Sequence, residues 1–148
     1  MSWPPHITVA VIVARNNKFL MVEEIRNDQC VYNQPAGHLE PNETLAQAAV
    51  REAYEETGWH VAPTHFLGVT RYVSTHSDTV YYRHTFIAEA LTHDLDATLD
   101  EGIVQSLWLS YDELCAAPDK CRSPLVLKNI EQFLAGERYP LHLIDDAS

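Results

Sequence analysis

The sequence has little positive charge and few cysteines. Its 148 residues include ten Lys and Arg against 21 Asp and Glu, which gives a formal net charge of −11. This balance argues against a nucleic-acid polymer or an anionic membrane as the main partner. Cys30, Cys115 and Cys121 form no CxxC pair, and their odd number favours a reduced compartment over a disulfide framework. We therefore expect a cytoplasmic protein with inert thiols.

Long apolar runs are also missing. The first run, ITVAVIVA at residues 7–14, lacks a preceding basic segment and is rich in β-branched residues. It predicts a strand rather than a signal peptide, and no later run approaches the length of a membrane span. HExxH and Ser or Cys nucleophile patterns are absent too, so covalent catalysis is not indicated. With 46% apolar and 21% charged residues, residues 1–148 have the size and composition of a single globular domain.

The elements that the sequence does predict mix strands and helices. Turn residues, caps and apolar periodicity mark their limits. The expected order is a strand hairpin (6–15 and 18–25), a loop that includes a short extended piece, Pro and Gly (31–43), a helix capped by Thr44 (44–57), two strands (59–73 and 79–91), an acidic loop (92–102), a short strand (105–109) and two helices (110–117 and 125–136). This order predicts a mixed α/β fold with both faces of the sheet covered.

The stretch REAYEETG, residues 51–58, contradicts two rules of helix stability. Glu52, Glu55 and Glu56 share one helix face, where like charges cost about 0.2–0.5 kcal/mol per pair. Gly58 is a natural helix stop, so the helix dipole also disfavours the anions in the last turn. One explanation is a solvated, salt-bridged helix face. The other is a bound divalent cation, because hard cations such as Mg²⁺ take carboxylate oxygens as ligands.

The same stretch belongs to a longer pattern. Residues 37–59, GHLEPNETLAQAAVREAYEETGW, contain G, five residues, E, seven residues and then REAxEExGW. This pattern resembles the Nudix box at every fixed position. Three further pieces resemble a subfamily of bacterial Nudix phosphatases: NQPAGHLE before the helix, RSPLV at residues 122–126 and GERYPL at residues 136–141.

The resemblance implies an α/β/α sandwich with a mixed β-sheet between helices, and hydrolysis of a diphosphate linked to another group. It implies Mg²⁺ as cofactor, with Mn²⁺ as a substitute, and Glu52, Glu55, Glu56 and the Gly37 carbonyl as metal ligands. We interpret Arg51 as the residue that orients the catalytic carboxylates rather than one that touches substrate. The implied substrates are nucleoside tri- and diphosphates and hydroxymethylpyrimidine pyrophosphate, and the subfamily suggests a monomer.

Other acidic candidates also have ordinary structural explanations. Glu43, in the box, is either an outer ligand or the partner of Arg51. Asp100 and Glu101 lie in the acidic loop where some Nudix enzymes place an additional ligand or base. The alternative is that Asp100 and Glu101 are exposed acidic residues of the loop with neither role.

Substrate contacts are predicted on strands and beside the box loop. Arg71, Tyr82 and Arg83 lie on expected strands, and arginine suits bidentate contacts to phosphate. Asn33 and Gln34 precede the Gly37 loop and could read the edge of a base or pyrimidine. Surface ion pairs and turn stabilisation are the alternatives for these residues.

Three functions remain open on the sequence. The first is a magnesium-dependent hydrolase of small phosphorylated substrates, including the possibility of a dinucleoside polyphosphate or a nucleotide sugar. The second is a binding module that senses a nucleotide without cleaving it, although none of the box glutamates is missing. The third is an enzyme that processes RNA 5′ ends, which the acidic composition disfavours.

Overall fold

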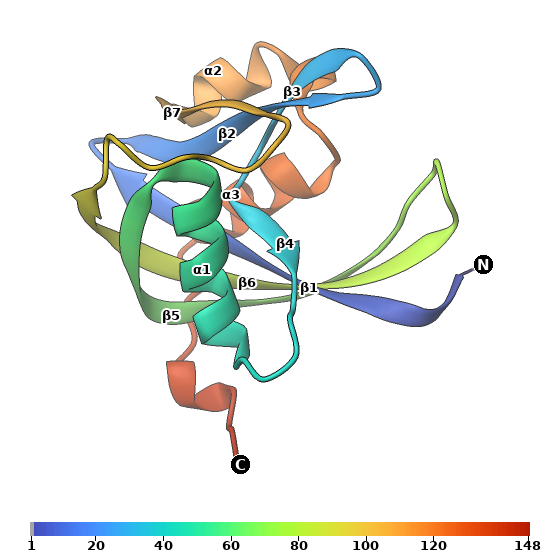
Figure 1. Cartoon of the computed structure of the whole chain (residues 1–148), viewed down its shortest axis with the longest axis vertical. Helices are drawn as coiled ribbons and strands as arrows, with labels where there is room; N and C mark the ends of the chain where they lie inside the picture. The colour runs from blue at the N-terminus through green and yellow to red at the C-terminus, as the bar shows by residue number, and fades with distance from the viewer. Residues whose placement is uncertain (1) are drawn as a thin grey trace.

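The computed structural model describes residues 2–148, with side chains from residue 4 onward (Figure 1). The elements are β1 (Ser2–Arg15), β2 (Lys18–Arg26), β3 (Gln29–Asn33), β4 (Ala36–His38), α1 (Leu45–Thr57), β5 (Trp59–Val73), β6 (Thr79–His93), β7 (Ile103–Leu109), α2 (Tyr111–Cys115), η1 (Pro118–Lys120), α3 (Leu125–Leu134) and η2 (Leu141–Leu143). Within residues 2–148, no helix is both long and apolar enough to cross a membrane.

The sheet is built around β1. Its strand order is β3-β2-β1-β6-β5, with β4 paired to β1 and β7 paired to β2. β1 and β6 run parallel, whereas the other strand pairs are antiparallel. Along one edge of β1, β4 pairs with Thr8–Ala10 and β2 pairs with Ala14 and Arg15. The sheet therefore divides along this edge, and no strand of residues 2–148 pairs with the other side of β4, which we call its free edge.

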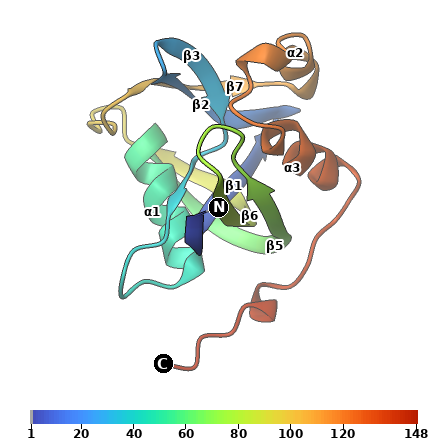
Figure 2. The same ribbon diagram turned by 90° about the vertical axis from the view of Figure 1, so that its right-hand side faces the viewer.

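Two apolar cores lie on opposite faces of the sheet, because successive strand side chains alternate in direction. On one face, α1 packs Ala49 against Val11 and Phe86. On the other face, Val126 of α3 belongs to a cluster with Ile12. Figure 2 shows α1 and α3 on the two sides of the sheet. The predicted mixed sheet between helices is thus confirmed.

The helix that carries the box, α1, begins and ends as its local sequence predicts. Thr44 Oγ1 accepts a hydrogen bond from the Gln47 N–H at 3.1 Å, and Gln47 Oε1 accepts one from the Thr44 N–H at 2.9 Å. This capping box satisfies N–H groups that the helix itself leaves unpaired. Gly58 ends the helix with φ of 76°, a left-handed conformation that glycine adopts without strain.

Residues 31–43 differ from the loop that the sequence predicts. Residues 31–33 extend β3, which pairs with β2, and Ala36–His38 form β4 against β1. The Pro35 carbonyl also accepts a hydrogen bond from the Val11 N–H at 3.0 Å. Pro and Gly are local turn signals, but pairing with a distant strand outweighs such signals. The loop prediction was therefore wrong for Ala36–His38, whereas the predicted short extended piece lies in β3.

Candidate active site

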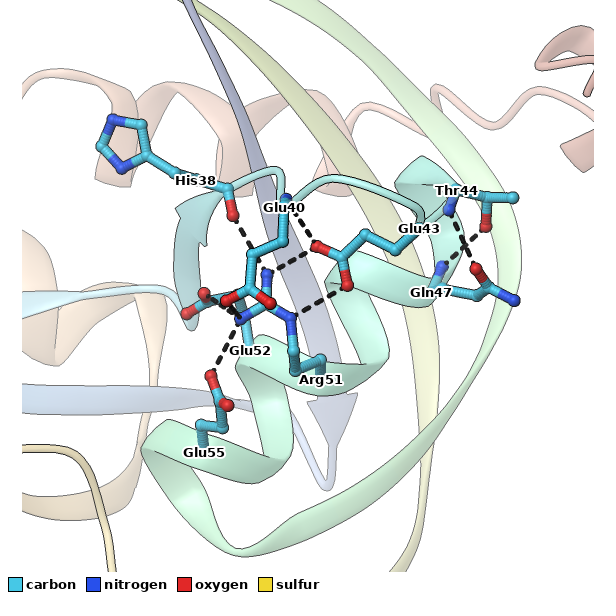
Figure 3. A network of polar contacts seen from close by, with 8 residues as sticks. All are labelled: His38, Glu40, Glu43, Thr44, Gln47, Arg51, Glu52 and Glu55. Atoms are coloured by element: carbon cyan, nitrogen blue, oxygen red, sulfur yellow. Dashed lines mark hydrogen bonds and ion pairs between the residues drawn. The ribbon is translucent and has the colours of Figure 1, made fainter.

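Arg51 lies at the centre of an ion-pair network on α1 (Figure 3). Its Nη2 and Nε donate to the two carboxylate oxygens of Glu43 at 2.7 and 3.0 Å. Its Nη1 donates to Glu52 at 2.7 Å and to Glu55 at 2.9 Å. Nη2 also donates to the His38 carbonyl at 3.0 Å. Arg51 therefore fixes the orientation of the box carboxylates, and the structure makes Glu43 its partner.

This network contains more negative than positive charge. Hydrogen bonding to Arg51 lowers the pKa of Glu43. Glu52, whose residue is only 7% exposed, has a raised pKa because its burial outweighs its bond to the same arginine. The negative charge of Glu55 raises the pKa of Glu52 further. Glu40 lies 3.4 Å from Arg51 Nη1 as well, so one guanidinium pairs with four carboxylates and does not neutralise them.

Glu56 projects toward the free edge of β4. Its Oε1 accepts a hydrogen bond from the Ala36 N–H at 2.9 Å. Burial raises the pKa of Glu56 to about 8, and the negative charges of Glu52, Glu24 and Asp100 add to the shift. Without a counter-charge, this carboxyl therefore keeps its proton at neutral pH.

The loop after β6 brings a further acid to the end of α1. The Asp100 N–H donates to the Glu55 carbonyl at 3.0 Å. Carboxylate oxygens of Glu52, Glu55 and Asp100 lie within 4.8 Å of one another. Desolvation of the Asp100 carboxyl and the charge of Glu55 raise the pKa of Asp100. Glu101 is exposed and lies outside this carboxylate group of the described residues, so the structure brings Asp100 rather than Glu101 to the box.

The register of β4 decides where its carbonyl groups point. In an antiparallel pair, alternate residues direct both N–H and C=O toward the partner strand. The Leu39 N–H donates to the Ile7 carbonyl at 3.1 Å. Gly37 lies two residues earlier, opposite Val9, so its carbonyl also points toward β1. The Gly37 carbonyl that was expected to bind metal is therefore turned away from the free edge.

Ala36 presents its backbone to that edge instead. Its N–H donates to Glu56, and its carbonyl shares this direction because both groups of a strand residue face the same side. Gly37 has a different role, since a Cβ added there would collide with the carboxylate of Glu52. The missing side chain leaves room for that carboxylate against β4.

The oxygen atoms gathered around β4 and α1 are suitable ligands for a hard divalent cation. Such cations prefer oxygen ligands and are often bound by carboxylates and backbone carbonyls. The carboxylate group of Glu52, Glu55 and Asp100 supplies three oxygens close together. Ala36 adds a carbonyl in the direction of Glu56, whose pKa is raised by burial and by the negative charges of Glu52, Glu24 and Asp100.

Arg83 on β6 is a buried arginine that contacts the turn between β3 and β4. Arg83 is 6% exposed, and its Nη2 donates to Gln34 Oε1 at 2.6 Å. Gln34 Nε2 donates to the Val126 carbonyl at 2.8 Å, which fixes the amide. Burial lowers the pKa of Arg83 to about 10. Among the residues that the structure describes, Arg83 Nε and Asn33 Oδ1 are buried without a hydrogen-bond partner, and such groups are costly unless a ligand satisfies them.

Comparison with known proteins identifies the family. A family model described as the NUDIX domain matches residues 4–127. The chain belongs to the NUDIX family. The phosphatase NudJ of Escherichia coli (strain K12) is 41% identical over 142 residues, which cover 96% of this chain and 92% of that protein. NudJ of Shigella flexneri matches with the same identity and coverage.

A solved structure supports the same conclusion. The NUDIX hydrolase from Nitrosomonas europaea superposes with a TM-score of 0.94 at 42% sequence identity, covering 96% of this chain and 97% of that one. This chain is therefore a Nudix hydrolase, an enzyme similar to the phosphatase NudJ.

The strand candidates of this Nudix hydrolase lie on two different faces of the sheet. Arg83 and Ile87 are four residues apart on β6, and Ile87 belongs to the core beside α3. Tyr82 and Phe86 share the opposite face, where Phe86 packs in the core beside α1. Arg71 pairs with Tyr82 across β5 and β6 and so shares its face. Arg71 and Tyr82 therefore do not join Arg83.

The sequence patterns did not single out a second group of charges near Arg83. Arg122 Nη1 donates to Glu24 Oε1 at 3.0 Å, and Arg26 Nε lies 3.7 Å from the same oxygen. After burial, the charge of Arg122 is the next cause that lowers the pKa of Arg83. The RSPLV piece at residues 122–126 could have indicated this group of charges, because it begins with Arg122.

Proposed function

We propose that this Nudix hydrolase is a Mg²⁺-dependent pyrophosphohydrolase of nucleoside tri- and diphosphates and small pyrophosphates such as hydroxymethylpyrimidine pyrophosphate. We propose that Mn²⁺ can replace Mg²⁺. The carboxylate group of Glu52, Glu55 and Asp100, held within 4.8 Å beside Arg51, carries this proposal. The 41% identity to a protein named Phosphatase NudJ supports the substrate class, and the resemblance to bacterial Nudix phosphatases suggests the pyrimidine pyrophosphate.

We assign the cation to Glu52, Glu55 and Glu56, with the Ala36 carbonyl in the place expected for that of Gly37. When bound, the cation supplies a Lewis acid that polarises phosphoryl oxygens and offsets their developing charge. Arg51 keeps the first two carboxylates oriented through its bonds of 2.7 and 2.9 Å. Glu56 has to lose its proton before it can act as an anionic ligand, because its pKa without a cation is about 8.

Asp100 and Arg83 complete the proposed machinery. Asp100 is the additional ligand or the base, since its carboxylate lies with those of Glu52 and Glu55 whereas Glu101 is exposed outside the group. As a base, Asp100 would accept the proton of the attacking water on a carboxylate oxygen. Arg83 offers its unpartnered Nε–H to a phosphate oxygen, and such charge-assisted hydrogen bonds are strong.

The proposed partners are small phosphorylated molecules. The net charge of −11 disfavours nucleic-acid polymers and anionic membranes as ligands. A cytoplasmic monomer is the working assumption, which rests on the odd cysteine count and on the subfamily resemblance.

The test is a hydrolysis panel with purified protein and Mg²⁺. It includes nucleoside di- and triphosphates, nucleotide sugars, dinucleoside polyphosphates and hydroxymethylpyrimidine pyrophosphate, and it measures phosphate and pyrophosphate release. We expect activity to disappear with EDTA and to return with Mg²⁺ or Mn²⁺. Full activity after thorough chelation contradicts the cation assignment. A preference of more than about a thousandfold in kcat/KM for one nucleotide sugar or dinucleoside polyphosphate contradicts the proposed substrates and keeps the family.

Two glutamine variants test which carboxylates the hydrolysis requires. Glu56→Gln keeps an oxygen that can accept the Ala36 N–H and removes the negative charge, so turnover should fall by at least about 100-fold. Glu101→Gln is the matched control and should retain wild-type turnover, because this exposed side chain lies outside the carboxylate group. Equal losses in both variants would contradict the assignment of Asp100 over Glu101.

A further inference from the structure

Three aromatic rings meet on the sheet beside β4. His6 Nδ1 and His38 Nε2 lie 2.9 Å apart. The ring centroids are separated by 5.1 Å between His6 and His38, 5.4 Å between His6 and Tyr81, and 6.2 Å between His38 and Tyr81. The rings come from β1, β4 and β6, and we call these three residues the aromatic wall. Residues from three strands thus form one aromatic surface.

The strand register places the aromatic wall beside Arg83. His6 lies opposite Tyr81, and Thr8 lies opposite both His38 and Arg83 on its two sides. Paired residues project from the same face of a sheet, and so do residues two apart on one strand. All three rings therefore share the face of Arg83, with Tyr81 the preceding residue of β6 on that face.

The aromatic wall also adjoins the carboxylate side of the site. The His38 carbonyl accepts the hydrogen bond of 3.0 Å from Arg51 Nη2, and Gly37, which makes room for Glu52, is the preceding residue. The backbone of β4 thus contacts the carboxylate network, and the side chain of His38 on the same strand belongs to the aromatic wall. A substrate that spans the edge of β4 can reach both.

Packing of the protein interior does not account for these rings. Within the part of the chain that the structure describes, neither apolar core includes His6, His38 or Tyr81. His38 is exposed, and the other two are half-buried. The rings therefore present aromatic surface to solvent next to a buried arginine with an unpartnered Nε.

We propose that the aromatic wall stacks on the planar heterocycle of the substrate while the diphosphate lies between the carboxylates and Arg83. This inference rests on the proposed function and deepens it, because it predicts a preference for phosphates that carry a planar ring. Every nucleobase offers a π face, so stacking tolerates changes of base. The aromatic wall therefore favours a nucleobase or pyrimidine over a ring-free group without selecting strongly among bases.

The kinetic test compares two tyrosines, one inside the aromatic wall and one outside it. Tyr81→Leu removes a ring of the aromatic wall, and Tyr139→Leu is the control, because Tyr139 is exposed and pairs with Phe66 at the outer edge of β5. With Mg²⁺, we expect Tyr81→Leu to lower kcat/KM for CTP by about tenfold or more. The value for inorganic tripolyphosphate, which has no ring, should change by less than about twofold. Equal losses for the two substrates, or equal losses in the two variants, would overturn the proposal.

A binding measurement separates this inference from the proposed function. Without metal, saturation-transfer NMR should show transfer to the ring protons of UMP with wild type and with Tyr139→Leu, and a loss with Tyr81→Leu. This readout needs no hydrolysis, so it stands even if the protein cleaves no member of the panel. If Tyr81→Leu does not fold, His6→Leu should give the same selective loss. Unchanged transfer in a folded variant of the aromatic wall contradicts the proposal.

Discussion

Neutralising Glu56 should change how the stability of the cation-free protein depends on pH. Burial raises the pKa of this carboxyl to about 8 from an ordinary value of 4.5. Between these values the folded state keeps a proton that the unfolded state has lost, so the free energy of unfolding falls as pH rises. The slope is about 1.4 kcal/mol per pH unit at most. From about pH 5.5 to about pH 7.5 the loss is therefore about 1–3 kcal/mol, where the lower value allows for solvent screening of a half-buried group.

The assay is urea denaturation of wild type and Glu56→Gln in EDTA across this pH range. Glutamine keeps an acceptor for the Ala36 N–H, so the substitution removes the titration rather than the hydrogen bond. The stability of the variant relative to wild type should grow with pH and level off above about pH 8. Glu101→Gln should follow wild type at every pH.

Adding Mg²⁺ at neutral pH should reverse this order. A ligand at 100 times its Kd stabilises the folded state by about 2.7 kcal/mol, and the neutral amide should bind the cation more weakly than a carboxylate. Wild type should therefore gain more stability than Glu56→Gln. Parallel pH curves for the two proteins in EDTA would refute the reasoning, because they would show that Glu56 does not hold a proton in the folded state.

Three other substitutions test the support of the site. Gly37→Ala places a methyl group against the Glu52 carboxylate and should lower Mg²⁺-dependent turnover by at least about 100-fold; unchanged turnover would show that the carboxylate has room to move. Arg51→Lys cannot bridge the carboxylates as a planar fork, so the melting temperature should fall by about 2–8 °C, and an unchanged value contradicts the bridging role. Gln34→Leu removes the acceptor of Arg83 Nη2 and should cost about 1–3 kcal/mol in urea denaturation, whereas equal stability would mean that the arginine finds another partner.

The sequence by itself determined the features that depend on neighbouring residues. The glutamates three and four residues apart predicted one helix face, and Thr44 with Gln47 predicted the cap that α1 has. The bond from Arg51 to Glu55 spans one helical turn, so helix geometry alone brings the pair together. Helix geometry acts over a few residues, and these features could therefore be read without knowing the fold.

Only the tertiary structure decided which groups from distant segments reach that helix. The return of the loop after β6 brings Asp100 rather than Glu101 to the carboxylates. The register of β4 against β1 turns the Gly37 carbonyl inward and leaves the free edge to Ala36. These choices depend on pairing between segments that lie far apart in the chain, which local sequence does not specify.

The same reason explains the substrate-side residues. Tyr82 and Arg83 are adjacent, and the sequence treated them alike, but a strand directs successive side chains to opposite faces. A shift of one residue in register exchanges the two faces, and register is set by long-range burial rather than by local pattern. The aromatic wall was not predicted at all, because His6, His38 and Tyr81 meet only when β1 pairs with β4 on one side and with β6 on the other.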